Sequence, residues 1–169
     1  MGARRVLSAG KGTNKDGDGE KLIVKNRRAL FDYAIEETYE GGLVLVGSEV
    51  KSMRAGKVDV SDAYVQVDRG EAWLKQMYVA PFEQASAFPH EPRRSRKLLL
   101  KAREIEEIHR ELARGGATAV PMQLYFKEGR VKVEVGVGHG KKLHDKRADI
   151  AKKDAARDAR VAVRDAARR

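Results

Sequence analysis

The chain has 169 residues, a formal net charge of +10, 41% hydrophobic residues and no cysteine. This length and apolar content predict one folded domain with tails, and the missing cysteine excludes disulfide bonds and thiol chemistry. The longest apolar run, Leu43–Val46, is far too short to cross a bilayer, and the basic start of the chain lacks the apolar region of a secretory signal. We therefore expect a cytoplasmic, monomeric protein whose positive charge attracts a polyanion.

Composition divides the chain into an extension, a body and a tail. Met1–Lys21 is rich in Gly, Lys and Asp and poor in large apolar residues, which predicts disorder. Leu22–Gly138 holds nearly all the aromatic and β-branched residues and is long enough for a hydrophobic core. Gly138–Gly140 predicts a hinge, and we expect residues 139–169 to form a flexible basic tail.

Three segments of the body predict helices. Asn26 caps a short helix that runs to about Phe31, and Val50–Ala55 forms a second. Ser95 caps the longest helix, which runs through Arg114. Apolar residues at helical spacing give this third helix one buried face, made of Leu98, Ala102, Ile105, Ile108 and Leu112.

Six short strands, paired as three hairpins, account for most of the remaining body. The pairs are Tyr33–Tyr39 with Leu43–Ser48, Ser61–Asp68 with Glu71–Val79, and Val120–Phe126 with Val131–Val137. A Gly-containing turn separates the members of each pair, which is a hairpin signal. Because closure removes exposed sheet edges, the six strands favour a small barrel. The predicted class is therefore mainly β with helices (α+β).

The tail carries much of the positive charge. From Lys141 onward it contains eleven Lys or Arg and five Asp, so it supplies +6 of the net charge. On a helical wheel Lys153, Arg157, Arg160 and Arg164 share one stripe, and alanines form another face. The segment has too little apolar surface to fold alone, so we expect a helix that forms on a polyanion, with RNA the leading candidate. The alternative is a solvated, frayed end.

A second basic cluster lies near the predicted long helix. Leu99 falls off the apolar face of that helix, and Arg96, Lys97 and Lys101 flank it. This mixture suits an RNA surface, where a base or sugar packs against carbon and phosphates meet the cations.

Three long blocks of the chain resemble the SsrA-binding protein (SmpB) family. They are Lys25–Val65, Arg94–Ile105 and Val135–Ile150, the last containing the GKK and HDKR elements. The resemblance implies an oligonucleotide-binding-type β-barrel with added helices. It also implies a role in trans-translation, in which the barrel binds the tRNA-like part of transfer-messenger RNA. The tail then enters the empty decoding site and mRNA channel of a stalled ribosome, and elongation factor Tu joins the aminoacylated complex.

The resemblance also assigns residues. Glu40 corresponds to the glutamate of the family's RNA-binding surface and Leu99 to an apolar contact; Lys101 stands where some relatives have Asn or His, and it can donate but not accept. The residues expected to bind transfer-messenger RNA are Asn26, Tyr33, Glu40, Lys51, Arg54, Arg94, Arg96, Lys97, Leu99 and Lys101. Those expected to bind the ribosome are Gly140, Lys141, Lys142, His144, Asp145, Lys146, Arg147, Lys153, Arg157, Arg160 and Arg164.

Other classes of function fit the sequence less well. His139, His144 and Asp145 lie close together, but on a Gly-rich segment without the convergent groups that catalysis needs. We therefore expect no catalytic residue, metal or cofactor. The alanine face of the tail lacks the large apolar anchors of a membrane-surface helix. The remaining alternative is another barrel-type RNA-binding translation factor that acts on ribosomes without transfer-messenger RNA.

Overall fold

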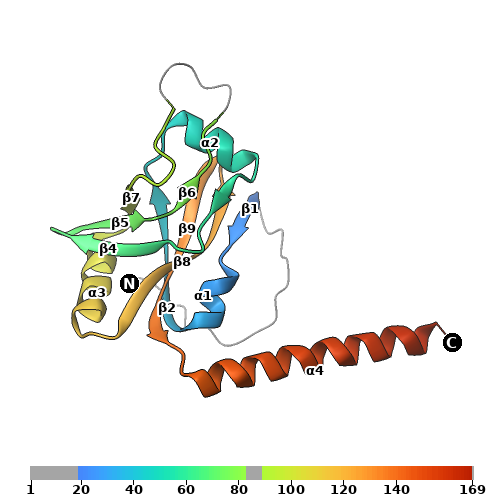
Figure 1. Cartoon of the computed structure of the whole chain (residues 1–169). Helices are drawn as coiled ribbons and strands as arrows, with labels where there is room; N and C mark the ends of the chain where they lie inside the picture. Colours follow the sequence, from blue (N-terminus) through green and yellow to red (C-terminus); the bar gives the residue numbers. More distant parts are fainter. Residues whose placement is uncertain (1–18, 83–88, 169) are drawn as a thin grey trace.

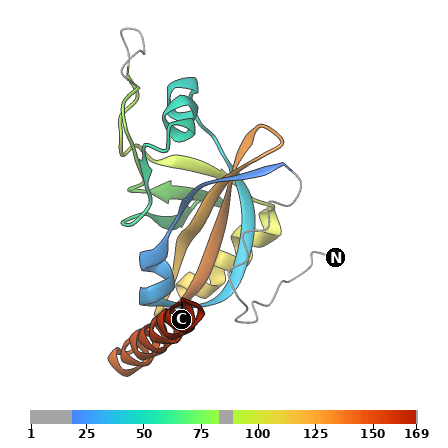
Figure 2. The same ribbon diagram turned by 90° about the vertical axis from the view of Figure 1, so that its right-hand side faces the viewer.

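A large, curled antiparallel sheet dominates the computed structural model, which describes residues 19–82 and 89–168. Figures 1 and 2 show helices placed around this sheet and one long helix projecting from it. The strands are β1 (Glu20–Lys25), β2 (Tyr33–Leu43), β3 (Val58–Asp59), β4 (Tyr64–Asp68), β5 (Glu71–Lys75), β6 (Tyr78–Val79), β7 (Arg96–Leu99), β8 (Ala117–Lys127) and β9 (Arg130–Gly140). The helices are α1 (Arg27–Asp32), α2 (Gly47–Arg54), α3 (Ala102–Ala113) and α4 (Leu143–Ala167).

The α+β class is confirmed, but the predicted closed, six-stranded barrel is wrong. In the described ranges seven strands pair in the order β1-β8-β9-β2-β7-β5-β4, and β3 pairs separately with β6. The edge strands β1 and β4 are not hydrogen-bonded to each other; β4 instead packs against β8 without a ladder. Most of the predicted N-terminal extension, residues 1–18, lies outside the described residues, whereas Glu20 and Lys21 belong to β1.

The β8–β9 hairpin is the centre of the sheet and matches its prediction. Val131, Val133 and Val135 alternate with polar residues along β9 and are buried in the core cluster that also includes Ile108 of α3. Glu128 and Gly129 both have positive φ, of 52° and 74°, as a two-residue hairpin turn requires. The predicted pairing of β4 with β5 is also confirmed.

The predicted hairpin across Glu40-Gly41-Gly42 is wrong, because β2 runs straight through these residues. The glycines serve close packing instead of a turn. A Cβ on Gly41 would lie 2.8 Å from the Leu100 side chain, and Gly42 pairs with Leu99 of β7. The segment expected to be the second strand of that hairpin ends in α2, which begins at Gly47, three residues before the predicted Val50.

The predicted helix from Ser95 to Arg114 is also wrong in its first part. Arg96 and Leu98 are buried while Leu99 is 55% exposed, so the side chains alternate as in a strand and form β7. Helix α3 begins only at Ala102, where the Glu104 carboxylate accepts a hydrogen bond from the Lys101 N–H at 3.0 Å. Ile105, Ile108 and Leu112 of the predicted apolar face pack against the core as expected, whereas Ala102 is exposed.

Helix α1 lies between the sheet and α4 (Figure 1). Its predicted cap is confirmed: Asn26 Oδ1 accepts from the Ala29 N–H at 3.0 Å. The predicted hinge at Gly138–Gly140 is wrong, since these residues are the end of β9. At Gly138 the chains approach so closely that a Cβ would lie 2.0 Å from the Ala34 carbonyl oxygen.

Helix α4 projects away from the body, as Figures 1 and 2 both show. It is a continuous helix of 25 residues without a buried side chain. The start of α4 contacts α1. None of the described helices is long and apolar enough to span a membrane.

Candidate RNA-binding surface

Glu40 lies on the outer face of the sheet and is held in place by two neighbours. The Tyr125 hydroxyl donates a hydrogen bond to Glu40, and Lys127 Nζ lies 3.4 Å from Glu40 Oε1. The Tyr125 hydrogen bond lowers the pKa of the Glu40 carboxyl, while burial raises the pKa of Tyr125. Glu40 is therefore a fixed anion, and with 43% of its side chain exposed it can accept from a base amino group.

Leu99 borders a hollow of about 300 Å³ in the same outer face. Gly42 contributes no side chain there, and Leu45 lines the apolar part. Arg130 and Lys132 lie at its edge, so a base or sugar packed on Leu99 would have two cations beside it. Sequence reasoning missed both cations, although the alternation along β9 places Lys132 opposite the buried valines.

Helix α2 adds two oriented cations near this region. Lys51 Nζ lies 5.3 Å from the Phe82 ring centroid, and the Arg54 guanidinium lies 5.9 Å from that of Phe126. Both basic side chains belong to exposed residues, and the aromatic faces attract them by cation–π interaction. The predicted positions of Lys51 and Arg54 on the surface agree with the structure.

Arg96 does not belong to the surface, because it is fully buried in an ion cluster with Glu49 and Arg94. Its remaining donors go to the carbonyl oxygens of Met77 at 2.8 Å, Arg94 at 3.0 Å and Pro92 at 3.2 Å. The prediction that Arg96 contacts RNA is therefore wrong for this conformation. Arg94 keeps 28% of its side chain exposed, but it too is bound to Glu49.

The charges of this cluster follow from burial and pairing. Burial alone would raise the pKa of Glu49, but hydrogen bonds from Arg94, the Val46 N–H and Arg96 reverse this and lower it. Burial lowers the pKa of Arg96, and the hydrogen bond and charge of Glu49 oppose this by favouring the charged guanidinium. The cluster joins α2 to β7 and so fixes the helix that carries Lys51 and Arg54.

Three further predicted residues have structural partners. Asn26 is buried, and its amide nitrogen donates to the carbonyl oxygens of Val60 and Pro121, so its predicted RNA contact is also wrong here. Tyr33 is half-buried against the small apolar cluster under α1. Lys97 forms an exposed ion pair with Glu71 at 2.9 Å. Lys101 is exposed at the start of α3.

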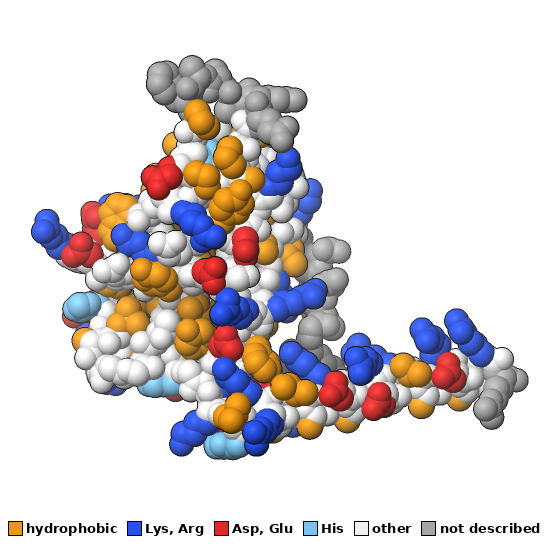
Figure 3. All heavy atoms as spheres, viewed as in Figure 1, with side chains coloured by type: hydrophobic (Ala, Val, Ile, Leu, Met, Phe, Trp, Pro, Cys, Tyr) orange, Lys and Arg blue, Asp and Glu red, His pale blue; other side chains and the backbone are white. Residues whose placement is uncertain are grey.

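The predicted tail residues fall into two groups. Lys141 and Lys146 are half-buried at the junction with α1. The others are all exposed, and Figure 3 shows Lys and Arg side chains along the edge of α4 nearest the body. The exposed set comprises Gly140, Lys142, His144, Asp145, Arg147, Lys153, Arg157, Arg160 and Arg164. Among the residues that the structure describes, no group of three His, Cys, Asp or Glu could hold a metal ion.

Comparison with known proteins assigns the chain to a family. The family model described as SmpB protein matches residues 23–165. The chain belongs to the SmpB family. It is 50% identical over 156 residues to the SsrA-binding protein of Roseiflexus sp. (strain RS-1), a match that covers 92% of this chain and 99% of the relative. It is 48% identical over 145 residues to the SsrA-binding protein of Desulforudis audaxviator (strain MP104C), covering 86% and 95%.

A solved SmpB-family structure shares the fold. It is a chain of "tmRNA-SmpB: a journey to the center of the bacterial ribosome", with a TM-score of 0.62 and 45% sequence identity. The match covers 72% of this chain and 86% of that chain. The SmpB family model extends to residue 165, so it includes most of α4 as well as the body.

Proposed function

We propose that this chain binds transfer-messenger RNA and takes part in ribosome rescue by trans-translation. The observation that carries the proposal is the pairing of two surfaces, an outer sheet face around Glu40 and Leu99 and a separate cationic helix. Relatives about half identical over nearly their whole length are SsrA-binding proteins, and the similar solved chain comes from a complex of tmRNA and SmpB. Both support the proposal.

The two surfaces suit different parts of the task. The body offers a fixed acceptor at Glu40, an apolar contact at Leu99 and cations around them, which suits a folded RNA with accessible bases. Helix α4 is roughly 38 Å long at 1.5 Å per residue and carries the cationic stripe on one face. Such a rod suits a narrow channel walled by phosphates. We infer that α4 occupies the empty decoding site and mRNA channel, with elongation factor Tu a partner of the aminoacylated complex.

Sequencing the RNA that co-purifies with the chain tests the partner. One abundant RNA of the transfer-messenger class is expected. Recovery of ribosomal RNA alone would instead support the alternative, a translation factor that acts without transfer-messenger RNA.

A tail deletion tests the division between body and tail. Removing residues 150–169 should change affinity for transfer-messenger RNA by no more than about twofold, because the body surface stays intact, and should abolish tagging of stalled peptides. A collapse of RNA binding in this deletion would contradict the proposed division.

A sharper pair of variants keeps the helix. Replacing Arg157, Arg160 and Arg164 by Gln removes three cations from one stripe and keeps strong helix formers. Replacing Asp154, Asp158 and Asp165 by Gln alters the neighbouring stripe and raises helix propensity, so it also keeps the helix. Tagging in a reconstituted translation system should fall strongly in the first variant and survive in the second. Equal loss in both would show that the stripe is not the contact.

A further inference from the structure

Trp73 is the one tryptophan of the chain, and it lies half-buried on the outer face of β5. Its neighbours Ala72 and Leu74 are fully buried in the core, so the alternation along the strand points the indole away from the core. A sheet face that meets water usually carries polar residues, and this one carries the largest aromatic side chain. One such side chain alone would mean little, so its surroundings decide what it can do.

The register of the sheet places Trp73 next to the outer face around Glu40 and Leu99. Trp73 pairs with Lys97 of β7, and Leu99 lies two residues farther along the same face of β7. Diagonal neighbours of this kind lie roughly 7–8 Å apart, within reach of an aromatic ring. Leu99 in turn pairs with Gly42 of β2, on the face that carries Glu40. The indole therefore continues the apolar part of that face across one strand.

A second hollow, of about 440 Å³, adjoins the indole. Arg69 and Lys75 line it, and in the described part of the chain no carboxylate is paired with either. Of the two carboxylates at its border, Glu71 is already paired with Lys97 at 2.9 Å, and the other is Asp68. Three cations thus face two carboxylates. The volume lies in the range of small-molecule sites and is large enough for one nucleobase.

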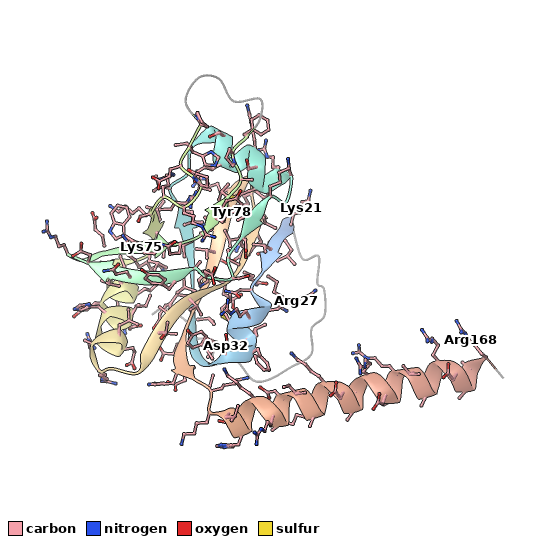
Figure 4. The ribbon with its side chains drawn as sticks, viewed as in Figure 1. Lys21, Arg27, Asp32, Lys75, Tyr78 and Arg168 are labelled. Carbon is pink, nitrogen blue, oxygen red and sulfur yellow. The ribbon has the colours of Figure 1, made fainter. Side chains whose placement is uncertain are left out.

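Nucleic acid is the partner that this combination fits. A base of any identity can stack on an aromatic face, and the phosphates beside it meet Lys or Arg. The same combination, an apolar contact with cations at its edge, occurs at Leu99. The base has to be unpaired, because a base inside a helix has no free face. Figure 4 shows Lys75 on the opposite side of the body from Arg168, near the end of α4, so this contact belongs to the body.

We propose that Trp73 is a stacking platform for an unpaired base of the bound RNA, with Arg69 and Lys75 meeting the adjoining phosphates. The RNA-contacting surface of the body then extends from Glu40 and Leu99 across β7 onto β5. This inference rests on the function proposed above, which names transfer-messenger RNA as the partner. It adds a contact that cations alone do not supply, because a phosphate contact does not read the base.

The fluorescence of Trp73 tests the stacking directly, because the chain has no other tryptophan. The full chain is titrated with transfer-messenger RNA, and binding is followed separately on end-labelled RNA. Quenching of the indole that saturates together with binding is the expected result. Full binding with unchanged fluorescence would overturn the platform and leave the proposed function standing. No binding at all would refute the proposed function, and this inference with it.

Two substitutions of Trp73 separate stacking from apolar bulk. Trp73→Phe keeps an aromatic face and should bind transfer-messenger RNA within about threefold of the unaltered chain, whereas Trp73→Leu keeps only apolar bulk and should bind about 5- to 140-fold more weakly. Circular dichroism checks that both variants are folded, and the titration above uses the unaltered chain and so depends on neither. Equal affinities of the two variants would overturn the proposal.

The salt dependence separates the ring from the cations. Stacking releases no counter-ions, so Trp73→Leu should lower the affinity without changing the slope of log affinity against log salt. Lys75→Gln should make that slope shallower by about 0.7–0.9, as the loss of one phosphate contact does. If Trp73→Leu changed the slope as Lys75→Gln does, the ring would serve only to hold the cations in place, which overturns the platform.

Discussion

Replacing Glu49 by Gln should unfold the chain at much lower denaturant concentration. Glu49 and Arg96 are both fully buried, and Arg94 binds the same carboxylate. The substitution keeps the shape of the side chain but leaves the Arg96 guanidinium without a counter-charge. Carbonyl oxygens around Arg96 still accept its hydrogen bonds, so the loss is mainly that of the charge.

The expected magnitude is large relative to the whole stability of a domain. Breaking a buried ion pair on one side costs about 3–5 kcal/mol, of a total free energy of unfolding of about 5–15 kcal/mol. With a urea dependence of about 2 kcal/mol per molar, the midpoint should fall by roughly 2 M. Trp73 is the one tryptophan of the chain and is half-buried on β5, so its fluorescence reports the transition.

Glu71→Gln provides the control, because it makes the same chemical change in the exposed pair with Lys97. It should cost less than about 1 kcal/mol. Equal midpoints for the two variants would refute the assignment of Arg96 to a buried ion cluster. The comparison also separates loss of a charge in a buried cluster from loss of any carboxylate.

Acid should remove the same stabilisation in the unaltered chain. The pKa of Glu49 is lowered on folding, from an unfolded value of about 4.3. A carboxyl with a lowered folded pKa stabilises the protein above its unfolded pKa and loses that contribution as the pH falls toward the folded value. The stability difference between the unaltered chain and Glu49→Gln should therefore shrink below about pH 4.3. A difference that stays constant there would contradict the pairing.

The remaining predictions concern Glu40, strand packing and RNA affinity. Tyr125→Phe removes the donor to Glu40, so the pKa of Glu40 should rise in an NMR titration and stability should fall by about 1.5–3 kcal/mol. Gly138→Ala places a Cβ 2.0 Å from the Ala34 carbonyl oxygen and should lower the free energy of unfolding by about 3 kcal/mol or more. In the control, Gly140→Ala, the added Cβ has no neighbouring atom within 4 Å, so this variant should have the melting temperature of the unaltered chain. If the chain contacts 6–10 phosphates, RNA affinity should fall by about 10³–10⁵ between about 50 and 200 mM salt; a flat response would favour shape and stacking.

Elements specified by neighbouring residues were predictable from the sequence. The alternation of Val131, Val133 and Val135 identified β9, because a strand with one buried face repeats every two residues. The cap at Asn26 was predictable for the same reason, since the side chain bonds to a backbone group three residues away. Neither signal depends on where distant parts of the chain lie.

Elements specified by distant packing were not predictable. Gly41-Gly42 has the composition of a turn, but here it lets β7 lie close against β2. The segment Arg96–Leu99 has the composition of the start of a basic helix, and its alternation is too short to stand out. Its pairing with β2 and β5, both more than 20 residues earlier in the sequence, shows that it is a strand.

The same distinction explains which candidate RNA contacts are exposed on the surface and which are not. A sequence shows how many cations a chain has but not which of them already have an internal carboxylate. Arg94 and Arg96 are bound to Glu49, and Lys146 is bound to Asp32. To bind phosphate, each of these cations would first have to break its ion pair. The stripe from Arg157 to Arg164 remains exposed. The net charge of +10 therefore overstates the number of cations that the body can offer RNA. The buried carboxylate of Glu49 acts on binding indirectly, because it fixes α2, the helix that presents Lys51 and Arg54.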